Sequence, residues 1–384
     1  MPEIVVPAFS PEAVTAAVQN GASAVYLDFS GFADEEAFSA AVRCCRVRGV
    51  KIYFSLDRAF TDAELPSAID AAGRALRLGV HAVEAGDLGL LSALRKLYPS
   101  ARLHLGLHAG IHNAAGAATA AYIGADRIVL SPRLTLSEIC SIRSSVKAEL
   151  EVPCHGPVCT AAPGSCRMSA FSGRGEACFG RCSGICRKGF GLDAGRGDFH
   201  LSSRDICLFR ELPELISAGI LAFRVLGSAR RAEYSALTAE IYSAAAAGRE
   251  PESRSLELLE KAFAPGGMVC GFFDRSDPAQ YFGKQDDSPR HPQALLSGVS
   301  GKYLSGEAAL VPVRLLAYAK RGEPFRLAIA DDSGVSAVTT LPPPEPVAGR
   351  GELTSAGLRT QLYNLRIEPF FCRDAACAVD SGLY

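Results

Sequence analysis

Residues 4–29 read IVVPAFSPEAVTAAVQNGASAVYLDF, and this stretch contains two short apolar runs with a helical pattern between them. The apolar runs, Ile4–Ala8 and Ser23–Phe29, have the length and composition of buried strands. Between them, Ser10-Pro11-Glu12 opens a helix, because serine caps a helix and proline fits its first turn. A strand, a helix and a second strand in this order predict a parallel βα repeat.

The same alternation continues to about residue 247. Further strand candidates are Val50–Leu56, His81–Asp87, Arg102–Ala109, Arg127–Pro132, Leu150–His155 and Phe223–Gly227. Thr61–Glu64 and Thr135–Glu138 have the form of a capping box and predict two of the helix starts. Eight strands with intervening helices predict a (β/α)8, TIM-like barrel. An open doubly wound sheet is the alternative, but the G-x-G-x-x-G fingerprint is missing after the first strand.

The composition is that of an ordinary globular protein, with 48% hydrophobic and 21% charged residues among 384. A net charge of −1 excludes a globally basic nucleic-acid binder. No uncharged apolar run reaches the roughly 18 residues of a transmembrane helix. Met1–Pro7 lacks the basic and apolar regions of a signal peptide. These features predict a cytoplasmic protein without a membrane partner, in a reducing compartment.

The pattern changes after the predicted barrel, 1–248. Short alternating runs such as Phe325–Ile329 and Val335–Thr339 predict a small β-rich domain over 249–341. Pro342–Gly351 has the composition of a linker and begins an accessory C-terminal segment, 342–384. Because the chain stops soon after a strand-like run, we expect this last unit to be incomplete.

Thirteen cysteines in a reducing compartment need a role other than disulfides. Six are scattered and are interpreted as small buried apolar side chains: Cys44, Cys45, Cys140, Cys270, Cys372 and Cys377. Seven fall in an insertion, 154–207, before the last strand candidate: Cys154, Cys159, Cys166, Cys178, Cys182, Cys186 and Cys207. Lys188–Ser202 within it is interpreted as a glycine-rich hairpin. In a barrel, the loop after a strand lies at the face where active sites are built.

Cysteines grouped in this way are typical of a metal centre, because four thiolates held together bind Zn²⁺ or an iron–sulfur cluster. Cys178, Cys182 and Cys186 are four residues apart and would share one face of a helix. Gly180 and Gly184 favour a loop instead. The spacing leaves a cluster, a zinc ion and the absence of metal open.

Histidines near this insertion are candidates for substrate chemistry. His155 ends a strand beside the cysteines, where an imidazole could transfer a proton, bond to a cluster sulfur or satisfy a buried carbonyl. His104, His108 and His112 are spaced four residues apart, and a metal triad is one interpretation of them.

Residues 167–210 carry a local positive charge, with eight basic and four acidic side chains. This segment could offset an anionic cluster, contact RNA phosphates or hold a small carboxylate, and a solvated loop is the alternative. Arg187 and Arg204 are the candidates for substrate binding. Asp205 is expected to cap a helix over Leu208–Ser217.

At these residues the chain resembles the U32 family, historically described as collagenase-like peptidases. Five motifs similar to those of the family occur in its order: Pro7–Glu12 with Phe9 in place of glycine, Gly21–Leu27, His155–Cys159 with Gly164–Cys166, Gly180–Arg187, and Ser203–Leu215. The resemblance covers about residues 3–247. It implies a [4Fe–4S] cluster, with zinc as the alternative.

The resemblance also implies site residues and an activity. The cluster ligands correspond to Cys159, Cys166, Cys182 and Cys207, with Cys178 and Cys186 as alternates. Residues 353–370 are similar to the accessory region of larger members, which include the hydroxylase of a cytidine in 23S ribosomal RNA. Other members hydroxylate tRNA uridines or act in oxygen-independent ubiquinone hydroxylation. The implied activity is therefore oxygen-independent hydroxylation of an rRNA or tRNA base.

The chain departs from the family on the last strand, where K-I-E-G-R is replaced by Arg224–Ser228. Leu226 replaces the acid and Ser228 an arginine, which indicates a redirected or lost activity. A U32 peptidase is one alternative, although no Ser/His/Asp order or His-Glu-x-x-His motif is present. A non-catalytic iron–sulfur or zinc scaffold is the other, and the replaced residues favour it. The sequence carries no sign of the oligomeric state.

Overall fold

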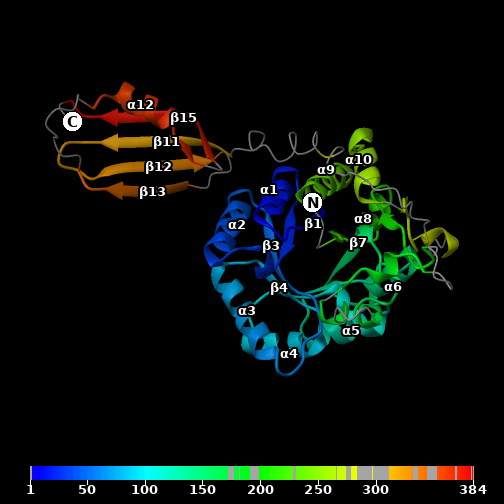
Figure 1. Cartoon of the computed structure of the whole chain (residues 1–384). Coiled ribbons are helices and arrows are strands. Elements are labelled where there is room, and N and C mark those ends of the chain that lie inside the picture. Colours follow the sequence, from blue (N-terminus) through cyan, green and yellow to red (C-terminus); the bar gives the residue numbers. More distant parts are fainter. Residues whose placement is uncertain are drawn as a thin grey trace. The chain divides into compact units, whose positions relative to one another are not determined.

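The computed structural model describes residues 2–171, 177–180, 182–190, 199–227, 231–264, 266–273, 278–282, 296, 311–331, 336–343, 353–367, 370–381 and 383. The chain divides into two compact units, Met1–Leu304 and Ser305–Tyr384 (Figure 1). None of the helices in the described residues is long and apolar enough to cross a lipid bilayer.

The first unit is a closed barrel of eight parallel strands. They are β1 Glu3–Pro7, β2 Ala24–Leu27, β3 Lys51–Leu56, β4 Ala82–Ala85, β5 Leu103–Leu105, β6 Arg127–Val129, β7 Glu149–Pro157 and β9 Ala222–Val225. Each strand pairs with the next, and β9 closes the ring because Phe223 lies opposite both Ile4 on β1 and Val152 on β7. Every strand overlaps a predicted one, so the predicted (β/α)8 barrel is confirmed.

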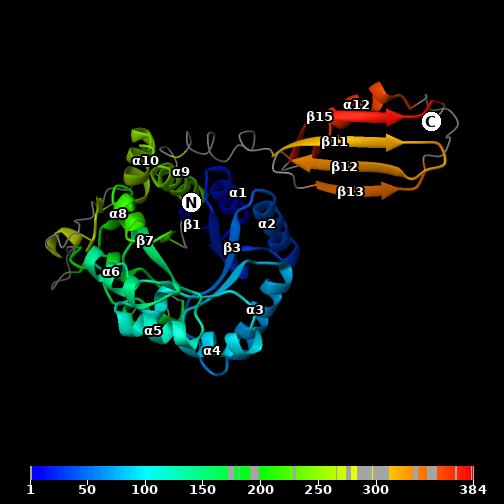
Figure 2. The ribbon, with the colours of Figure 1, turned by 180° about the vertical axis from the view of Figure 1, so that it is seen from behind.

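Helices form an outer ring around the strands, which Figure 2 shows from behind. They are α1 Pro11–Gln19, α2 Glu35–Val47, α3 Leu65–Leu78, α4 Leu88–Leu97, α5 Ala114–Ile123, α6 Leu136–Ser145, α8 Leu212–Ser217, α9 Ala232–Ala246 and α10 Ser253–Phe263, with 3₁₀ turns η1 Phe29–Gly31, η2 Leu107–Ala109 and η5 Pro278–Tyr281. Ser10 caps α1 and a capping box starts α6 at Thr135, as predicted. Only half of the box predicted at Thr61 forms: Glu64 bonds back to Thr61 N, but Glu64 N donates to the Thr61 carbonyl and not to its hydroxyl. The predicted helix start is therefore wrong, and α3 begins at Leu65 without a side-chain cap.

The apolar core lies between the strands and the helical ring, where Phe38, Phe54 and Leu91 are fully buried. The interior of the barrel is different, because it also holds charged side chains. Four that are at most 3% exposed are Glu84, Arg127, Glu151 and Arg224. Buried charges are costly unless they are paired, so their partners are important for the barrel.

The cysteine-rich insertion lies between β7 and β9, as predicted. Its far end returns as β8, Asp205–Cys207, which pairs antiparallel with the end of β7 and in parallel with β10, Met268–Val269. The rest contains only single turns: α7 Met168–Phe171, η3 Ala177–Phe179 and η4 Ile185–Arg187. Most of the predicted hairpin at Lys188–Ser202 lies outside the described residues.

The second unit is a sheet with a helix on one face. Its strands are β11 Val311–Ala319, β12 Phe325–Asp331, β13 Ser336–Leu341, β14 Arg366–Ile367 and β15 Phe370–Val379, in the order β13-β12-β11-β15-β14. Val313 and Leu315 form a core with Leu358 and Leu362 of α12, Ser355–Tyr363. The predicted β-rich C-terminal domain is confirmed.

The division between the units differs from the predicted boundaries after residues 248 and 341. Leu259 and Phe263 of α10 are part of the barrel core, and β11–β13 share one sheet with β15. The predicted linker, Pro342–Gly351, lies almost entirely outside the described residues.

Candidate functional site

The cysteine-rich insertion lies against loops at the carboxyl end of the barrel. Ala59, after β3, donates a backbone hydrogen bond to Cys178 O at 2.8 Å. Gly164 approaches the loop after β5 so closely that a Cβ on it would stand 1.9 Å from His108 O. The φ of Gly164, +75°, also favours glycine. The insertion therefore lies at the face where barrel enzymes build their sites.

Arg133, in the loop after β6, holds the backbone around the first candidate ligand. Its Nη2 donates to Cys159 O at 2.5 Å and also to Thr160 O. Thr160 Oγ1 in turn donates to Leu201 O at 2.7 Å. Residues 159 and 160 are thus fixed between the barrel loop and the far end of the insertion.

Four thiols of the insertion lie close enough to act on one another electrostatically: Cys159, Cys166, Cys182 and Cys186. Burial and the other three thiols raise the pKa of Cys159 to about 11, against the opposing effect of the Arg187 guanidinium. Burial also raises the pKa of Cys186. We call these four side chains the thiol group. It contains three of the four predicted ligands and one of the two alternates.

Cys207, the fourth predicted ligand, lies on β8 beside Tyr242 of α9. Tyr242 Oη lies 3.5 Å from Cys207 Sγ, 2.9 Å from Cys154 O and 3.2 Å from His155 Nδ1. It also accepts a hydrogen bond from Leu208 N at 3.2 Å. Burial raises the pKa of Cys207 to about 11, although the Tyr242 hydroxyl lowers it. Cys207 and His155 thus share a buried tyrosine.

The donor set of the thiol group fits an iron–sulfur cluster in kind. Within the described ranges, no three His, Cys, Asp or Glu side chains converge as they would around one metal ion. Cysteine thiolates are the ligands that iron–sulfur clusters use, and the thiol group gathers several of them beside the Arg187 guanidinium. The ligands of a cluster lie farther apart than those of a single metal ion. Cys178, the other alternate, is buried and its carbonyl faces the loop after β3.

The three histidines at spacing four do not meet. His104 is buried inside the barrel, with its ring 4.6 Å from that of Tyr53. His108 pairs with Asp57, and His112 Nδ1 lies 2.7 Å from Gly110 O. These separate partners exclude the metal triad.

The candidate substrate-binding arginines lie near β8. Arg187 donates to Ser203 Oγ at 3.3 Å, and its Nη1 lies 3.7 Å from Asp205 Oδ1. Arg204 donates its backbone N–H to the carbonyl of Tyr281 in η5. The predicted cap at Asp205 is wrong, because Asp205 is a buried strand residue and α8 begins only at Leu212. Part of the basic segment 167–210 lies outside the described residues.

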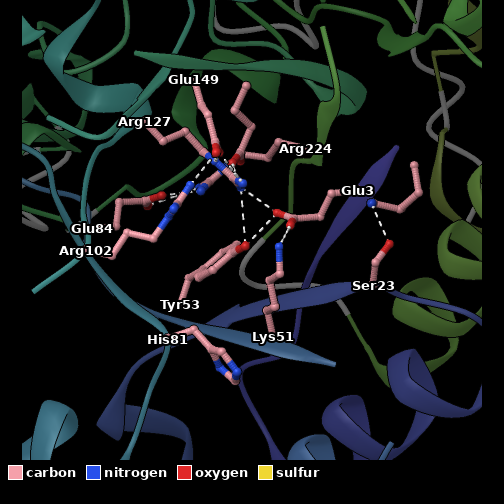
Figure 3. Close-up of polar contacts among 12 residues, drawn as sticks. Glu3, Ser23, Lys51, Tyr53, His81, Glu84, Arg102, Arg127, Glu149 and Arg224 are labelled. Atoms are coloured by element: carbon pink, nitrogen blue, oxygen red, sulfur yellow. Dashed lines mark hydrogen bonds and ion pairs between the residues drawn. The ribbon is translucent and has the colours of Figure 1, made fainter. Parts of the chain in front are cut away.

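Ion pairs of alternating charge pass through the barrel interior, and Figure 3 shows most of them. Arg127 Nη1 donates to Glu3 Oε1 at 2.5 Å and to Glu151 Oε2 at 3.1 Å. Arg224 Nε donates to Glu151 Oε1 at 2.5 Å, and its Nη1 donates to Glu84 Oε1 at 3.1 Å. Sequence reasoning missed these pairs. The available signal was acids and arginines within otherwise apolar strand candidates.

A pocket of about 300 Å³ lies at the opposite, amino-terminal end of the barrel. Four of its charged side chains are already paired: Lys51 Nζ lies 2.7 Å from Glu3 Oε2, and Arg127 Nη2 lies 2.8 Å from Glu149 Oε2 (Figure 3). The fifth, Arg143, donates to the carbonyl of Ala148 at 2.9 Å. This end of a barrel contributes stability rather than chemistry. We therefore place the candidate site at the carboxyl end.

A polar pair at the carboxyl end was not predicted. His108 Nδ1 lies 3.0 Å from Asp57 Oδ2, and His108 N donates to Asp57 Oδ1 at 2.9 Å. Burial alone would lower the pKa of His108, but the Asp57 carboxylate outweighs it and the pKa is raised. Burial alone would raise the pKa of Asp57, but His108 outweighs it and the pKa is lowered. The sequence signal was that both residues follow strand candidates.

The position of the replaced family acid is buried next to His155. Leu226 N donates to His155 O at 2.7 Å, and Leu226 O accepts from Tyr234 Oη at 2.5 Å. Leucine supplies no charge there, so the nearest charge on this strand is Arg224, which is paired with glutamates. The second replaced position, Ser228, lies outside the described residues.

The scattered cysteines are not all packed in the core. Cys45 and Cys372 are buried, as predicted, whereas Cys44, Cys270 and Cys377 are only partly buried. Cys140 is exposed on α6, so the prediction is wrong for it. It lies on a face of α6 other than that of the buried Ile139 and Ile142.

A (β/α)8 barrel that carries a cysteine-rich insertion over its carboxyl end is the class of protein that this fold and site define. The sequence profile of peptidase family U32 matches residues 9–281, and the chain belongs to this family. The resemblance found in the sequence motifs is thereby confirmed.

Relatives in the family carry two kinds of name. The chain is 26% identical to "Collagenase" of Porphyromonas gingivalis, over 60% of this chain and 62% of the relative. It is 23% identical to "tRNA hydroxylation protein P" of Escherichia coli, over 73% and 76%. It is 29% identical to a 23S rRNA 5-hydroxycytidine synthase of Escherichia coli, over 60% and 37%. The chain thus spans about three fifths of the length of the first relative.

Proposed function

We propose that this chain hydroxylates a base in RNA and that its cysteine-rich insertion holds a [4Fe–4S] cluster for this reaction. The observation that carries the proposal is the thiol group at the carboxyl end of the barrel. The names of relatives that act in tRNA and rRNA hydroxylation support RNA as the substrate. We place the protein in the cytoplasm, together with its substrate.

Three cysteines, Cys159, Cys166 and Cys182, would hold the cluster, with Cys186 or Cys207 as the fourth ligand. An iron–sulfur cluster supplies electron transfer. Arg187 offsets the negative charge of the thiolates, as its effect on the pKa of Cys159 indicates. Arg133 fixes the backbone at Cys159 and so orients its side chain.

Basic side chains around the insertion suit an anionic substrate. Arg133, Arg187 and Lys188 belong to the insertion or to the loop beneath it, and cations of this kind neutralise RNA phosphates. A base must leave its stack before an enzyme can act on its ring. A small carboxylate co-substrate is part of the proposal, with Arg187 and Arg204 as its contacts.

Metal analysis of protein purified without oxygen tests the cluster. We expect iron and acid-labile sulfide in similar amounts and a broad visible absorbance. Cys159→Ala and Cys182→Ala should each abolish both. Cys140→Ala is the matched control, because this exposed thiol lies outside the insertion. Zinc without iron, or unchanged iron in the two variants, would contradict the cluster.

The alternative is a peptidase, which the name of the Porphyromonas relative favours. A nucleophilic hydroxyl or thiol bonded to a histidine is the usual sign of such an activity. Among the described residues, no serine, threonine or cysteine side chain is hydrogen-bonded to the His108 ring. Proteolysis that persists in Cys159→Ala and Cys182→Ala but is lost in His108→Gln would establish the alternative and overturn our proposal.

A further inference from the structure

We propose that Asp57 and His108 form an acid–base pair in the barrel mouth, where His108 exchanges a proton with the substrate and Asp57 positions its ring. The inference rests on the proposed function for the identity of the substrate, an RNA base. The geometry and charge of the pair are independent of it.

The two residues reach each other from separate strands. Asp57 directly follows β3, and His108 lies in η2, which follows β5. The carboxylate holds the histidine at two points, the backbone N–H and ring Nδ1, at 2.9 and 3.0 Å. Since Nδ1 faces the Asp57 carboxylate as an ion-pair contact, the second ring nitrogen, Nε2, is the one that would meet a substrate. This is how an aspartate orients a catalytic imidazole.

Two glycines allow the Asp57–His108 pair to form and to lie beside the proposed site. A Cβ on Gly106 would stand 2.3 Å from Asp57 Oδ1, so the carboxylate can occupy its position only because residue 106 has no side chain. Gly164, two residues before Cys166, packs on the carbonyl of His108. The pair is therefore in direct contact with the segment that carries the thiol group.

The two side chains have the exposure that proton exchange requires. The Asp57 side chain is 12% exposed and that of His108 is 31% exposed, so the ring meets solvent while its partner is shielded. Glu84 acts with Asp57 to favour the protonated ring, and Arg224 acts against it. Arg224 also favours the ionised form of Asp57. Both shifts in pKa favour the form of the pair in which His108 is an imidazolium and Asp57 a carboxylate.

The chemical step is a proton transfer alone. The imidazolium gives its Nε2 proton to an oxygen or nitrogen atom of the substrate and becomes a neutral imidazole. The reverse transfer, from substrate or water to Nε2, restores it. Asp57 remains ionised and in contact with Nδ1 throughout, and no electrons leave the pair.

Titration of the His108 ring by NMR tests the pair without reference to RNA. We expect a pKa above the ordinary value of 6.5. Asp57→Asn keeps an acceptor for the backbone N–H but removes the charge, so the pKa of His108 should fall by about one unit or more. His112→Gln, which removes a histidine bonded only to a backbone carbonyl, is the matched control and should leave the value unchanged. An ordinary or lower pKa in the wild type, or no shift in Asp57→Asn, would overturn the pair.

Complementation of a strain that lacks the gene tests the role in the reaction. His108→Gln preserves the backbone bond to Asp57 and should retain iron, yet lower the modified nucleoside by about 100-fold or more. His112→Gln should restore it as the wild type does. Full restoration by His108→Gln would overturn the inference and leave the proposed function standing. If even the wild-type gene does not restore the modified nucleoside, the proposed function is overturned. The pKa of His108 measured by NMR then tests the Asp57–His108 pair by itself.

Discussion

Arg224 Nη1 donates a hydrogen bond to Glu84 Oε1 at 3.1 Å, although their strands, β9 and β4, stand opposite each other in the ring. The pair therefore ties two walls of the barrel through its interior. Glu151 on β7 accepts from the same guanidinium at 2.5 Å. One cation thus compensates two buried carboxylates.

Removal of this cation should destabilise the barrel strongly. Arg224→Met leaves two buried carboxylates without a partner on this side, which costs about 3–5 kcal/mol. Arg43→Met is the control, because the Arg43–Glu36 pair is 60% and 78% exposed and is worth at most about 1 kcal/mol. Urea unfolding measures both. Equal losses of unfolding free energy in the two variants would show that the interior ion pair stabilises the barrel no more than the exposed pair does.

Alanine substitutions at two glycines of the insertion distinguish the cost of a strained backbone from the cost of a steric clash. Gly164 and Gly184 both have positive φ, +75° and +63°. A Cβ at Gly164 meets His108 O, whereas one at Gly184 meets nothing within 4 Å. Gly184→Ala should cost about 1 kcal/mol, and Gly164→Ala clearly more. We also expect Gly164→Ala to lose bound iron, because it displaces the segment before Cys166. Retained iron and equal stabilities would contradict this packing.

The stability of the Asp57–His108 pair should depend on pH. Asp57 has a pKa lowered from 3.8, so its contribution is present above 3.8 and is lost as pH falls through the lowered value. His108 has a pKa raised from 6.5, so its contribution is full below 6.5 and is lost as pH rises through the raised value. Asp57→Asn should therefore lose on the order of 1 kcal/mol near pH 5.5 and less near pH 9. A loss that grows with pH would contradict the ion pair.

The barrel could be predicted from the sequence because each strand is a local apolar pattern. Ile4–Ala8 and Ser23–Phe29 needed no distant partner to be recognised as strands. The helix start at Thr61 was wrong because a Thr-x-x-Glu pattern does not specify whether the backbone N–H of the glutamate bonds to the threonine hydroxyl, which caps a helix, or to the threonine carbonyl, which closes a turn.

A buried tyrosine supports the strand that carries Cys207. Tyr242→Phe removes the hydroxyl that bonds to Cys154 O and lies near His155 Nδ1, whereas Leu208 N keeps its hydrogen bond to Cys154 O at 2.8 Å. We expect a loss of about 0.5–1.5 kcal/mol in unfolding free energy, because the buried hydrogen bonds of the hydroxyl are lost. Tyr363→Phe is the control, because this exposed tyrosine bonds only at the surface and should lose less than about 0.5 kcal/mol. Equal losses of unfolding free energy in Tyr242→Phe and Tyr363→Phe would contradict a structural role for the Tyr242 hydroxyl.

The site was harder to predict than the fold because its contacts join residues that are distant in the sequence. Asp57 and His108 are separated by 51 positions and meet only when β3 and β5 enter one sheet with β4 between them. The cysteines were recognised because they cluster along the chain. Their division, with Cys207 beside Tyr242 and Cys186 in the thiol group, depends on how the insertion folds back along β7.

The most direct test of the account is mass spectrometry of nucleosides from the tRNA and rRNA of a strain that lacks this gene. We predict that one nucleoside, heavier by one oxygen atom than its parent, disappears in that strain. The wild-type gene should restore it, and Cys159→Ala should not. An unchanged set of nucleosides in the deletion strain, or full restoration by Cys159→Ala, would contradict the account.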